Sequence, residues 1–162
     1  MTEAGTGAAT KTGAVAIRPL TAADRAAWQP LWQAYLDFYR QQLAEGVTDT
    51  VFARISGDGA HGGLVAERDG KMIGFVHYIV HETTWSLAPT CYLEDLYVDG
   101  AVRGSGAGRA LIEAVCEGAR ARGCRSVYWH THDDNARARA LYDKVAVLSP
   151  FVRYDHVLTQ KS

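Results

Sequence analysis

The stretch of residues 91–109 reads Cys-Tyr-Leu-Glu-Asp-Leu-Tyr-Val-Asp-Gly-Ala-Val-Arg-Gly-Ser-Gly-Ala-Gly-Arg. Its first part, residues 92–98, is short and rich in aromatic and branched apolar residues, which is typical of a buried strand. Apolar residues at helical spacing occupy positions 110–115. The glycines of residues 103–109 therefore lie where a strand leads into a helix.

Glycines at the start of a helix suit the binding of a diphosphate. The first amides of a helix have no partner within it and carry the positive end of its dipole. Glycine lets a phosphate approach that backbone closely and permits positive φ angles. The alternative is a glycine-rich turn without a ligand. The residues expected to form the diphosphate site, two of them cationic, are Arg103, Gly104, Ser105, Gly106, Ala107, Gly108 and Arg109.

The spacing of these glycines excludes two other nucleotide loops. A Walker loop needs a Gly-Lys-Ser/Thr ending, which is absent. The dinucleotide loop needs Gly-x-Gly-x-x-Gly, which Gly104, Gly106 and Gly108 do not provide. What remains is the pattern Arg103-x-x-Gly106-x-Gly108, which resembles the acetyl-CoA loop of the GCN5-related N-acetyltransferases (GNAT).

A second motif of that family follows, Asn135-x-x-Ala138-x-x-Leu141-Tyr142, with one expected strand between the two. The resemblance covers residues 14–158, and the end of the chain looks like the Hpa2-type histone and polyamine acetyltransferases. The strand at 92–98 resembles that of diamine and thialysine acetyltransferases of the spermidine/spermine type. One departure is the missing Gly-Phe after the last helix, where residues 145–151 read Val-Ala-Val-Leu-Ser-Pro-Phe.

The resemblance implies an α/β (α+β) protein with the GNAT fold. This fold is a mixed, strongly curved sheet of about six or seven strands, split in a V at the central strand and flanked by about four helices. We expect a flexible tail at 1–13 and one N-acetyltransferase domain at 14–162. Residues 81–89 are expected to be a loop, and residues 148–158 a last extended strand.

The family also implies acetyl-CoA as cofactor and a place for each of its parts. Backbone groups of Leu96, Tyr97 and Val98 would bind the pantetheine arm, and the glycine loop would bind the diphosphate. Asn135 would contact the cofactor arm. Tyr142 would bind the cofactor and donate a proton to the departing sulfur; the alternative for this tyrosine is a plain core role.

An amine acceptor requires a carboxylate, because an alkylamine with a pKa of about 10.4 is protonated at neutral pH. A carboxylate can attract the ammonium group and relay its proton, most simply through water. Glu94 is the candidate, since period-two alternation places it on one face with Leu96 and Val98; a strand carboxylate satisfied by neighbours is the alternative. Asp95 would face the other side unless a bulge re-aims it, and ranks second, as an amine-binding charge.

Aromatic residues are the candidates for the acceptor pocket. Residues 31–39 carry an aromatic face at helical spacing, which is usually core. In an acyltransferase of this shape, Tyr35 and Tyr39 would also wall the acceptor pocket. Trp85, in the expected loop, is either a satellite core contact or a lid over the substrate.

Composition narrows the class of protein further. The chain of 162 residues has no apolar run long enough for a membrane span, and its net charge of −1 gives no reason to expect nucleic acid. Three cysteines without paired spacing indicate reduced thiols and a cytoplasmic protein. Cys91 fits a small buried residue better than a group beside the thioester.

No metal site is expected. His77 and His81 lack the spacing to other ligands that a metal site requires, and both are interpreted as structural. His130 and His132 have no third ligand nearby in the sequence.

The leading hypothesis is therefore an acetyl-CoA-dependent N-acetyltransferase. It would act by direct transfer in a ternary complex on a primary amine of a small cationic molecule: a polyamine, a diamine or a lysine-like amino acid. One alternative is a non-catalytic acyl-CoA-binding or regulatory module. Another is a protein-lysine or N-terminal acetyltransferase. By analogy with the family, we expect a homodimer.

Overall fold

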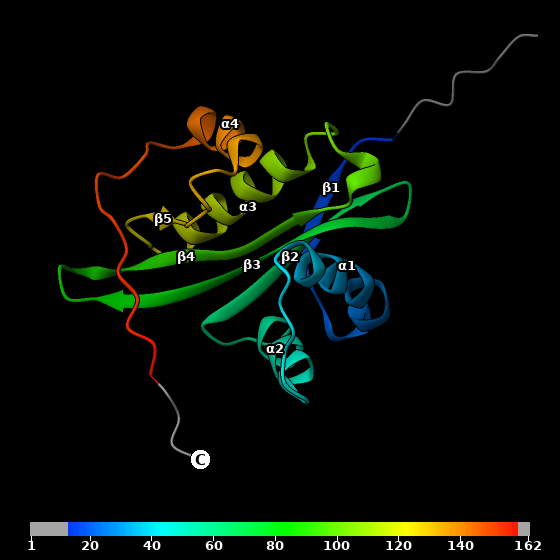
Figure 1. Ribbon diagram of the computed structural model, residues 1–162, viewed down its shortest axis with the longest axis horizontal. Helices are drawn as coiled ribbons and strands as arrows, with labels where there is room; N and C mark the ends of the chain where they lie inside the picture. Colours follow the sequence, from blue (N-terminus) through cyan, green and yellow to red (C-terminus); the bar gives the residue numbers. More distant parts are fainter. Residues whose placement is uncertain (1–12, 159–162) are drawn as a thin grey trace, which may run out of the picture. The chain divides into compact units, whose positions relative to one another are not determined.

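The computed structural model describes residues 13–158, which divide into two compact units, residues 13–130 and residues 131–158 (Figure 1). Except for Gly13, the tail expected at 1–13 lies outside the described residues. No helix within residues 13–158 is both long and apolar enough to cross a bilayer.

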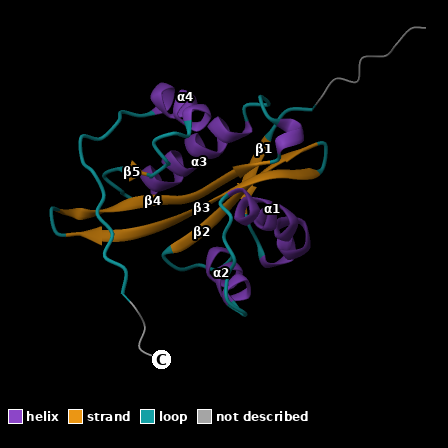
Figure 2. Cartoon of the chain, in the orientation of Figure 1, coloured by secondary structure: helices purple, strands orange, loops and turns teal. Residues whose placement is uncertain are grey.

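The first unit is built on one five-stranded sheet with strand order β1-β2-β3-β4-β5 (Figure 2). All neighbouring strands are antiparallel except β4 and β5, which are parallel. Helices α1 and α2 cover one face of the sheet and α3 the other (Figure 1). The strands are β1 (Ala16–Pro19), β2 (His61–Arg68), β3 (Lys71–Thr83), β4 (Ser86–Val98) and β5 (Val127–Tyr128); the helices are α1 (Arg25–Phe38), α2 (Val47–Ile55) and α3 (Ala107–Ala121).

The α/β class is confirmed, but the described residues contain five strands where about six or seven were expected. Residues 146–158 form no strand, so the last expected strand at 148–158 is absent. The loop expected at 81–89 was also wrong, because β3 and β4 run through it as a long hairpin joined by Thr84 and Trp85. Cross-strand hydrogen bonds hold this polar stretch extended although its composition favours a loop.

The tip of that hairpin carries Trp85, whose side chain is 81 % exposed. It is therefore not a core contact. Glu94 is nine positions further along extended chain, about 30 Å away at the usual rise of a strand. The structure does not bring Trp85 to the other candidate acceptor residues.

The V-shaped splay at the central strand is confirmed by the pairing of β4. This strand pairs with β5 only at Cys91 and Tyr92. From Leu93 to Val98 it pairs with β3 along one edge, and no described strand pairs with its other edge. Backbone groups along that open edge are available to a ligand.

Helix α1 packs on the sheet through a different set of residues from the one predicted. Trp28, Trp32 and Leu36 are buried, and they pack with Phe52 of α2 and Phe75 of β3. Phe38, predicted to lie on the apolar face, is 60 % exposed. The helix passes through Pro30 without interruption. The face that meets the sheet begins one turn earlier than the aromatic stripe suggested.

An ion-pair cluster fixes the chain just before α1. The guanidinium of Arg18 binds both oxygens of Asp24 at 2.8 Å and Glu67 at 2.6 Å. The backbone N–H of Thr21 also donates to Asp24. Mainly because of the Arg18 hydrogen bonds, the pKa of Asp24 lies well below its usual range. These contacts set the position at which α1 starts over the sheet.

The second unit contains helix α4 (Ala136–Val145). After it, residues 146–158 have neither helix nor strand and expose large apolar side chains, including Val147 at 94 % and Tyr154 at 92 %. The helix beginning at Asn135 is confirmed, whereas the strand after it is not.

Candidate active site

The glycine loop has the backbone that the sequence predicted. Gly104 and Gly106 have φ angles of +81° and +82°, and, chain neighbours aside, no heavy atom of residues 13–158 lies within 4 Å of the place where a Cβ would stand on either. Gly106 is the N-cap of α3 and has no side chain with which to cap it. The first turn of α3 therefore presents its amides beside open space, which fits a phosphate group.

The two arginines of the loop are exposed and differ in their contacts. Arg109 donates from Nε to Glu113 Oε1 at 2.7 Å, and both side chains are more than half exposed. A surface pair of this kind contributes little to stability and can exchange partners. Arg103 folds back over Gly100. Both cations remain near the N-terminus of α3.

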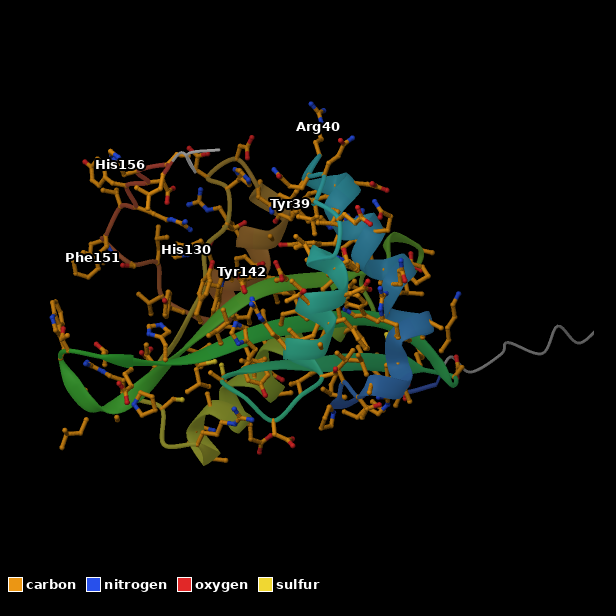
Figure 3. All side chains as sticks on the ribbon, turned by 90° about the horizontal axis from the view of Figure 1, so that it is seen from below. Tyr39, Arg40, His130, Tyr142, Phe151 and His156 are labelled. Atoms are coloured by element: carbon orange, nitrogen blue, oxygen red, sulfur yellow. The ribbon has the colours of Figure 1, made fainter. Side chains whose placement is uncertain are left out.

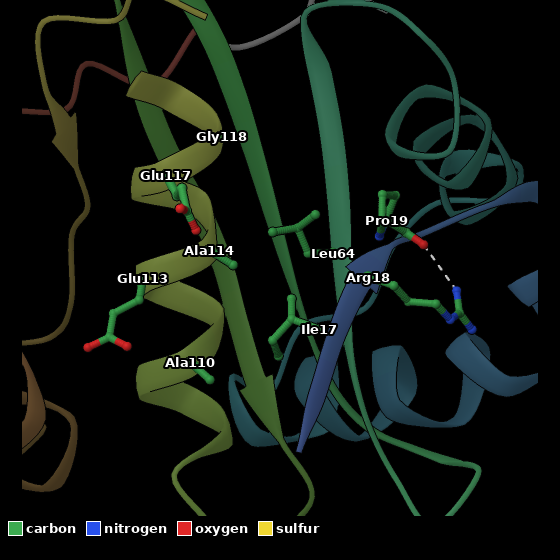
Figure 4. Close-up of a pocket in the computed structure, with 9 residues that line it drawn as sticks. All are labelled: Ile17, Arg18, Pro19, Leu64, Ala110, Glu113, Ala114, Glu117 and Gly118. Atoms are coloured by element: carbon green, nitrogen blue, oxygen red, sulfur yellow. Dashed lines mark hydrogen bonds between the residues drawn. The ribbon is translucent and has the colours of Figure 1, made fainter. Parts of the chain in front are cut away.

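A shallow groove of about 450 Å³ lies along the side of α3, facing β1 and β2 (Figure 4). Ala110, Ala114 and Gly118 form its floor on the helix, with Ile17 and Leu64 opposite. None of the predicted cofactor or acceptor residues lines it. The groove is separate from the candidate site.

A β-bulge re-aims the carboxylates of β4. Leu93 pairs with Tyr78 and Asp95 with His77, so Glu94 is the extra residue. Directly paired residues share a face of the sheet, which puts Asp95 on the face of His77. Leu96 pairs with Val76 and lies on the opposite face. The expectation that Glu94 shares a face with Leu96 and Val98 was therefore wrong, because the bulge breaks the alternation on which it rested.

The bulge brings Asp95 to α1. The Tyr35 hydroxyl donates to Asp95 Oδ1 at 2.7 Å, and His77 Nδ1 lies 2.9 Å from Asp95 Oδ2. The indole N–H of Trp28 donates to His77 Nε2 at 3.0 Å. The ring of Tyr39, directly after the end of α1, lies 4.9 Å from that of Tyr35 (Figure 3). Tyr35 thus contacts both Asp95 and Tyr39, so these three candidate acceptor residues lie together.

The protonation of these groups follows from burial and from the charge of Asp95. Burial, and then the Asp95 carboxylate, raises the pKa of Tyr35, so its hydroxyl stays a donor. The pKa of Tyr39 is raised by the same two causes. Partial desolvation, followed by the charge of Asp95, raises the pKa of Glu94 above its ordinary value. A glutamate with a raised pKa is better matched to proton transfer near neutral pH.

The two neighbouring carboxylates therefore differ in their surroundings. Both oxygens of Asp95 are engaged, and its side chain is 15 % exposed. Glu94 is exposed at the surface and forms no hydrogen bond or ion pair with any described residue. One carboxylate is held by hydrogen bonds and the other is not.

Two residues of the site were not predicted. Trp28 lies four residues before Trp32 and seven before Tyr35, so helical periodicity alone could have extended the face to it. His77 was interpreted as structural, and it is buried as that role requires. Its contact with Asp95 depends on the bulge, for which the sequence carries no signal.

The candidate residues of the second unit lie on and before α4. Asn135 caps the helix: its Oδ1 accepts from the Ala138 N–H at 3.3 Å, and its Nδ2 donates to Thr131 Oγ1 at 3.2 Å. This capping role gives a local reason for asparagine at this position. Tyr142 lies half-buried on α4 (Figure 3).

Cys91 is 1 % exposed, and burial raises its pKa to about 11. A thiol in this state is a poor nucleophile at neutral pH. Among residues 13–158, no three His, Cys, Asp or Glu side chains form a group that could hold a metal ion.

A family model described as "Acetyltransferase (GNAT) family" matches residues 27–146, most of the chain. The chain belongs to the GNAT acetyltransferase family. It is 36 % identical over 143 residues to D-amino-acid N-acetyltransferase HPA3 of Saccharomyces cerevisiae, covering 86 % of this chain and 89 % of that protein.

One further relative and one solved structure of similar fold widen the comparison. Aminoglycoside N(6')-acetyltransferase type 1 of Stenotrophomonas maltophilia is 32 % identical over 135 residues, 78 % of this chain and 81 % of that one. The solved structure of aminoglycoside N-acetyltransferase AAC(6')-Iy in complex with CoA matches with a TM-score of 0.71 at 19 % identity, covering 93 % and 95 % of the two chains.

This GNAT protein is accordingly an N-acetyltransferase whose cofactor is acetyl-CoA. The open, left-handed glycines before α3 are compatible with that cofactor, because without a Cβ they leave space beside the first amides of the helix. The splayed edge of β4 adds free backbone groups next to the loop in the chain.

Proposed function

We propose that this GNAT enzyme acetylates a primary amine of a small cationic molecule: a polyamine, a diamine or a lysine-like amino acid. The observation that carries the proposal is the bulge in β4, which places Asp95 against the Tyr35 hydroxyl of α1, while Glu94 beside it has no hydrogen bond to a described residue. One carboxylate held by hydrogen bonds and a neighbour without them suit an acceptor that must be held as a cation and then deprotonated.

Glu94 is the proposed base and Asp95 the proposed ammonium ligand. Only about one amine in a thousand is free base at neutral pH, a penalty of about 4 kcal/mol that a base at the site can offset. Glu94 receives the proton through water, and its raised pKa matches this task. Asp95, Tyr35 and Tyr39 bind and orient the acceptor. Trp85 is not part of this proposal, because it lies far along the hairpin.

The amides of residues 104–108 and the guanidinium groups of Arg103 and Arg109 would hold the diphosphate, and the backbone of residues 96–98 the pantetheine arm. Asn135 would contact the arm in addition to capping α4. When bound, acetyl-CoA supplies the acetyl group as an activated thioester. Tyr142 would donate its hydroxyl proton to the sulfur that departs when the acetyl group passes to the amine. Transfer is direct and uses no cysteine nucleophile, in keeping with the burial of Cys91.

Release of free thiol from acetyl-CoA, measured across a panel of amines, tests the proposal. The panel contains polyamines, diamines, lysine, D- and L-amino acids and an aminoglycoside, because the relatives named above act on D-amino acids and aminoglycosides. We expect the highest kcat/KM with a dicationic amine. Release with lysine-containing proteins or peptide N-termini but with no small amine would replace the proposal by the protein-acetylating alternative.

Binding of acetyl-CoA without thiol release in the presence of any acceptor would instead favour a non-catalytic regulatory module.

As part of the same proposal, residues 14–162 act as one catalytic domain in a cytoplasmic homodimer. The exposed apolar side chains of residues 147–158 support the dimer, since such segments pair readily with another chain. Light scattering during gel filtration gives the mass that decides between dimer and monomer.

A further inference from the structure

A buried chain of hydrogen bonds runs beneath the proposed acceptor site. It starts at the Trp28 indole on α1, passes through the His77 ring on β3 and ends at the Asp95 carboxylate on β4. Tyr35 of α1 binds the second oxygen of that carboxylate. Trp28 is 0 % exposed and the His77 side chain 2 %, so water does not compete for these contacts.

Trp28 fixes which atoms donate and which accept along this chain of hydrogen bonds. An indole N–H is a donor only, so His77 Nε2 must accept from Trp28 and carries no proton. A neutral imidazole then bears its proton on Nδ1, the nitrogen that faces Asp95 Oδ2. With the opposite tautomer, a lone pair on Nδ1 would face a carboxylate oxygen. Trp28 thus determines that His77 donates to Asp95.

The result is a carboxylate held at both oxygens by donors on two different elements. Each oxygen keeps a further lone pair, and the side chain is still 15 % exposed. Side chains whose rotamers are locked by packing and by hydrogen bonds hold a binding group within the narrow geometry that recognition needs. Glu94, one residue away, has no such contacts among the described residues.

We propose that His77 is a positioning residue: with its tautomer fixed by Trp28, it holds Asp95 so that the free lone pairs of this carboxylate receive the ammonium group of the acceptor. This inference rests on the proposed function, because it assigns a partner to Asp95. A change at His77 should therefore alter the affinity for the acceptor and not the affinity for acetyl-CoA, because the chain of hydrogen bonds lies on the α1 face of the sheet and not in the glycine loop.

The tautomer is measured first, on the native protein, by long-range ¹⁵N–¹H correlation of the imidazole rings. We expect His77 to carry its proton on Nδ1. A proton on Nε2 contradicts the proposal. No acceptor is present in this measurement, so its outcome does not depend on which amine, if any, is acetylated. Failure of every amine in the panel would remove the proposed function and leave the tautomer result standing.

Kinetics of matched variants then test the role in binding. His77→Leu removes the donor, and we expect the acceptor KM to rise about 10- to 100-fold, the scale of a hydrogen bond to a charged group, with the acetyl-CoA KM changed less than about 2-fold. His77→Asn keeps an N–H close to the position of Nδ1 and should recover most of the loss. Phe75→Leu perturbs the same core, since this ring stacks on His77 at 4.5 Å, but leaves the hydrogen bonds intact.

A rise in both KM values together, or equal values for the Leu and Asn variants, would overturn the proposal. Should His77→Leu fail to fold, Trp28→Phe takes its place: it frees Nε2, and we expect a loss of the pure Nδ1–H tautomer together with a higher acceptor KM. An acceptor KM like that of the native enzyme in this variant would equally refute the role of His77.

Discussion

Under the proposed function, the glycine loop and the buried hydrogen-bond chain would serve the two substrates in opposite ways. The loop is a contiguous run, residues 103–109, whose backbone amides would bind the diphosphate together with two arginines, and Gly104 and Gly106 stand beside open space. The chain is formed by side chains of Trp28, His77, Asp95 and Tyr35, which are distant in sequence and meet in a closed core. A site built from backbone can be recognised from a short motif. A site built from packed side chains exists only once the sheet has its register.

The same contrast predicts how each region responds to substitution. A side chain added to the loop should fill ligand space and leave the fold almost intact. Removal of a side chain from the buried hydrogen-bond chain should weaken acceptor binding and leave the affinity for acetyl-CoA unchanged. Substitutions in each region and in the family's second motif, ordered by the size of the expected effect, test whether the two regions are separable in this way.

Tyr142→Phe examines the second motif of the family, on α4, and should have the largest effect. We expect turnover to fall about 10²- to 10⁴-fold, the usual range for loss of a general acid, with acetyl-CoA affinity little altered. Single-turnover rates and equilibrium binding of acetyl-CoA give the two quantities separately. An unchanged rate would remove Tyr142 from the mechanism.

Gly106→Val tests the loop. Its φ of +82° is unfavourable for valine, and the side chain would occupy the open space beside the first amides of α3. Loss of two charge-assisted hydrogen bonds corresponds to about a 10²- to 10³-fold weaker affinity for acetyl-CoA, measured by calorimetry.

Gly123→Val is the matched control for Gly106→Val. It has a φ of +73° and open space around its Cβ position, and it lies after the other end of α3. It should lower the melting temperature by a similar amount without changing acetyl-CoA affinity. Tight binding of acetyl-CoA by folded Gly106→Val would mean that the diphosphate site lies elsewhere.

Glu94→Gln tests the proposed base through the dependence of activity on pH. An ordinary glutamate has a pKa of about 4.3. Because the pKa of Glu94 is raised, its carboxylate form is lost at a higher pH as the pH falls. We expect the acid limb of kcat/KM, which reports the free enzyme, in that higher range for the native enzyme, and its disappearance in the variant, with turnover lower by about 100-fold. Asp95→Asn removes a neighbouring negative charge and should shift the limb to lower pH. A limb unmoved in both variants would assign the base to another residue.

Tyr35→Phe should have the smallest effect. It removes one of the two donors to Asp95 and keeps the ring in the core. A hydrogen bond to a charged group at the low end of its range, about 1.5 kcal/mol, corresponds to a rise of about 10-fold in acceptor KM. The acetyl-CoA KM, measured in the same assays, is the internal control. A rise in that constant would show that the two regions are not separable.

The parts of the fold that depend on local backbone demands were predictable from the sequence. The turn at Asp69 and Gly70 has positive φ angles at both residues, as its Asp-Gly sequence requires. The strand–loop–helix around Gly106 and the start of α4 at Asn135 followed from the same kind of signal.

Parts that depend on pairing between distant segments were not predictable. The bulge at Glu94 is set by the register of β4 against β3, and one inserted residue reverses every side chain beyond it. The polar hairpin around Trp85 is extended only because its two strands bond to each other. Residues 148–158 have the apolar composition of a strand, yet they have no strand partner among the described residues. In each case the deciding contact lies outside the segment whose composition was interpreted.

We propose that the amides at the N-terminus of α3 bind the cofactor, whereas the buried chain of hydrogen bonds holds Asp95 for binding of the acceptor. Backbone amide signals recorded during a titration with CoA test it most directly. We predict that, within residues 13–130, the largest shifts occur at Gly106, Ala107 and Gly108, with little change at His77 and Tyr35. Unchanged loop amides together with large shifts along α1 would contradict the account.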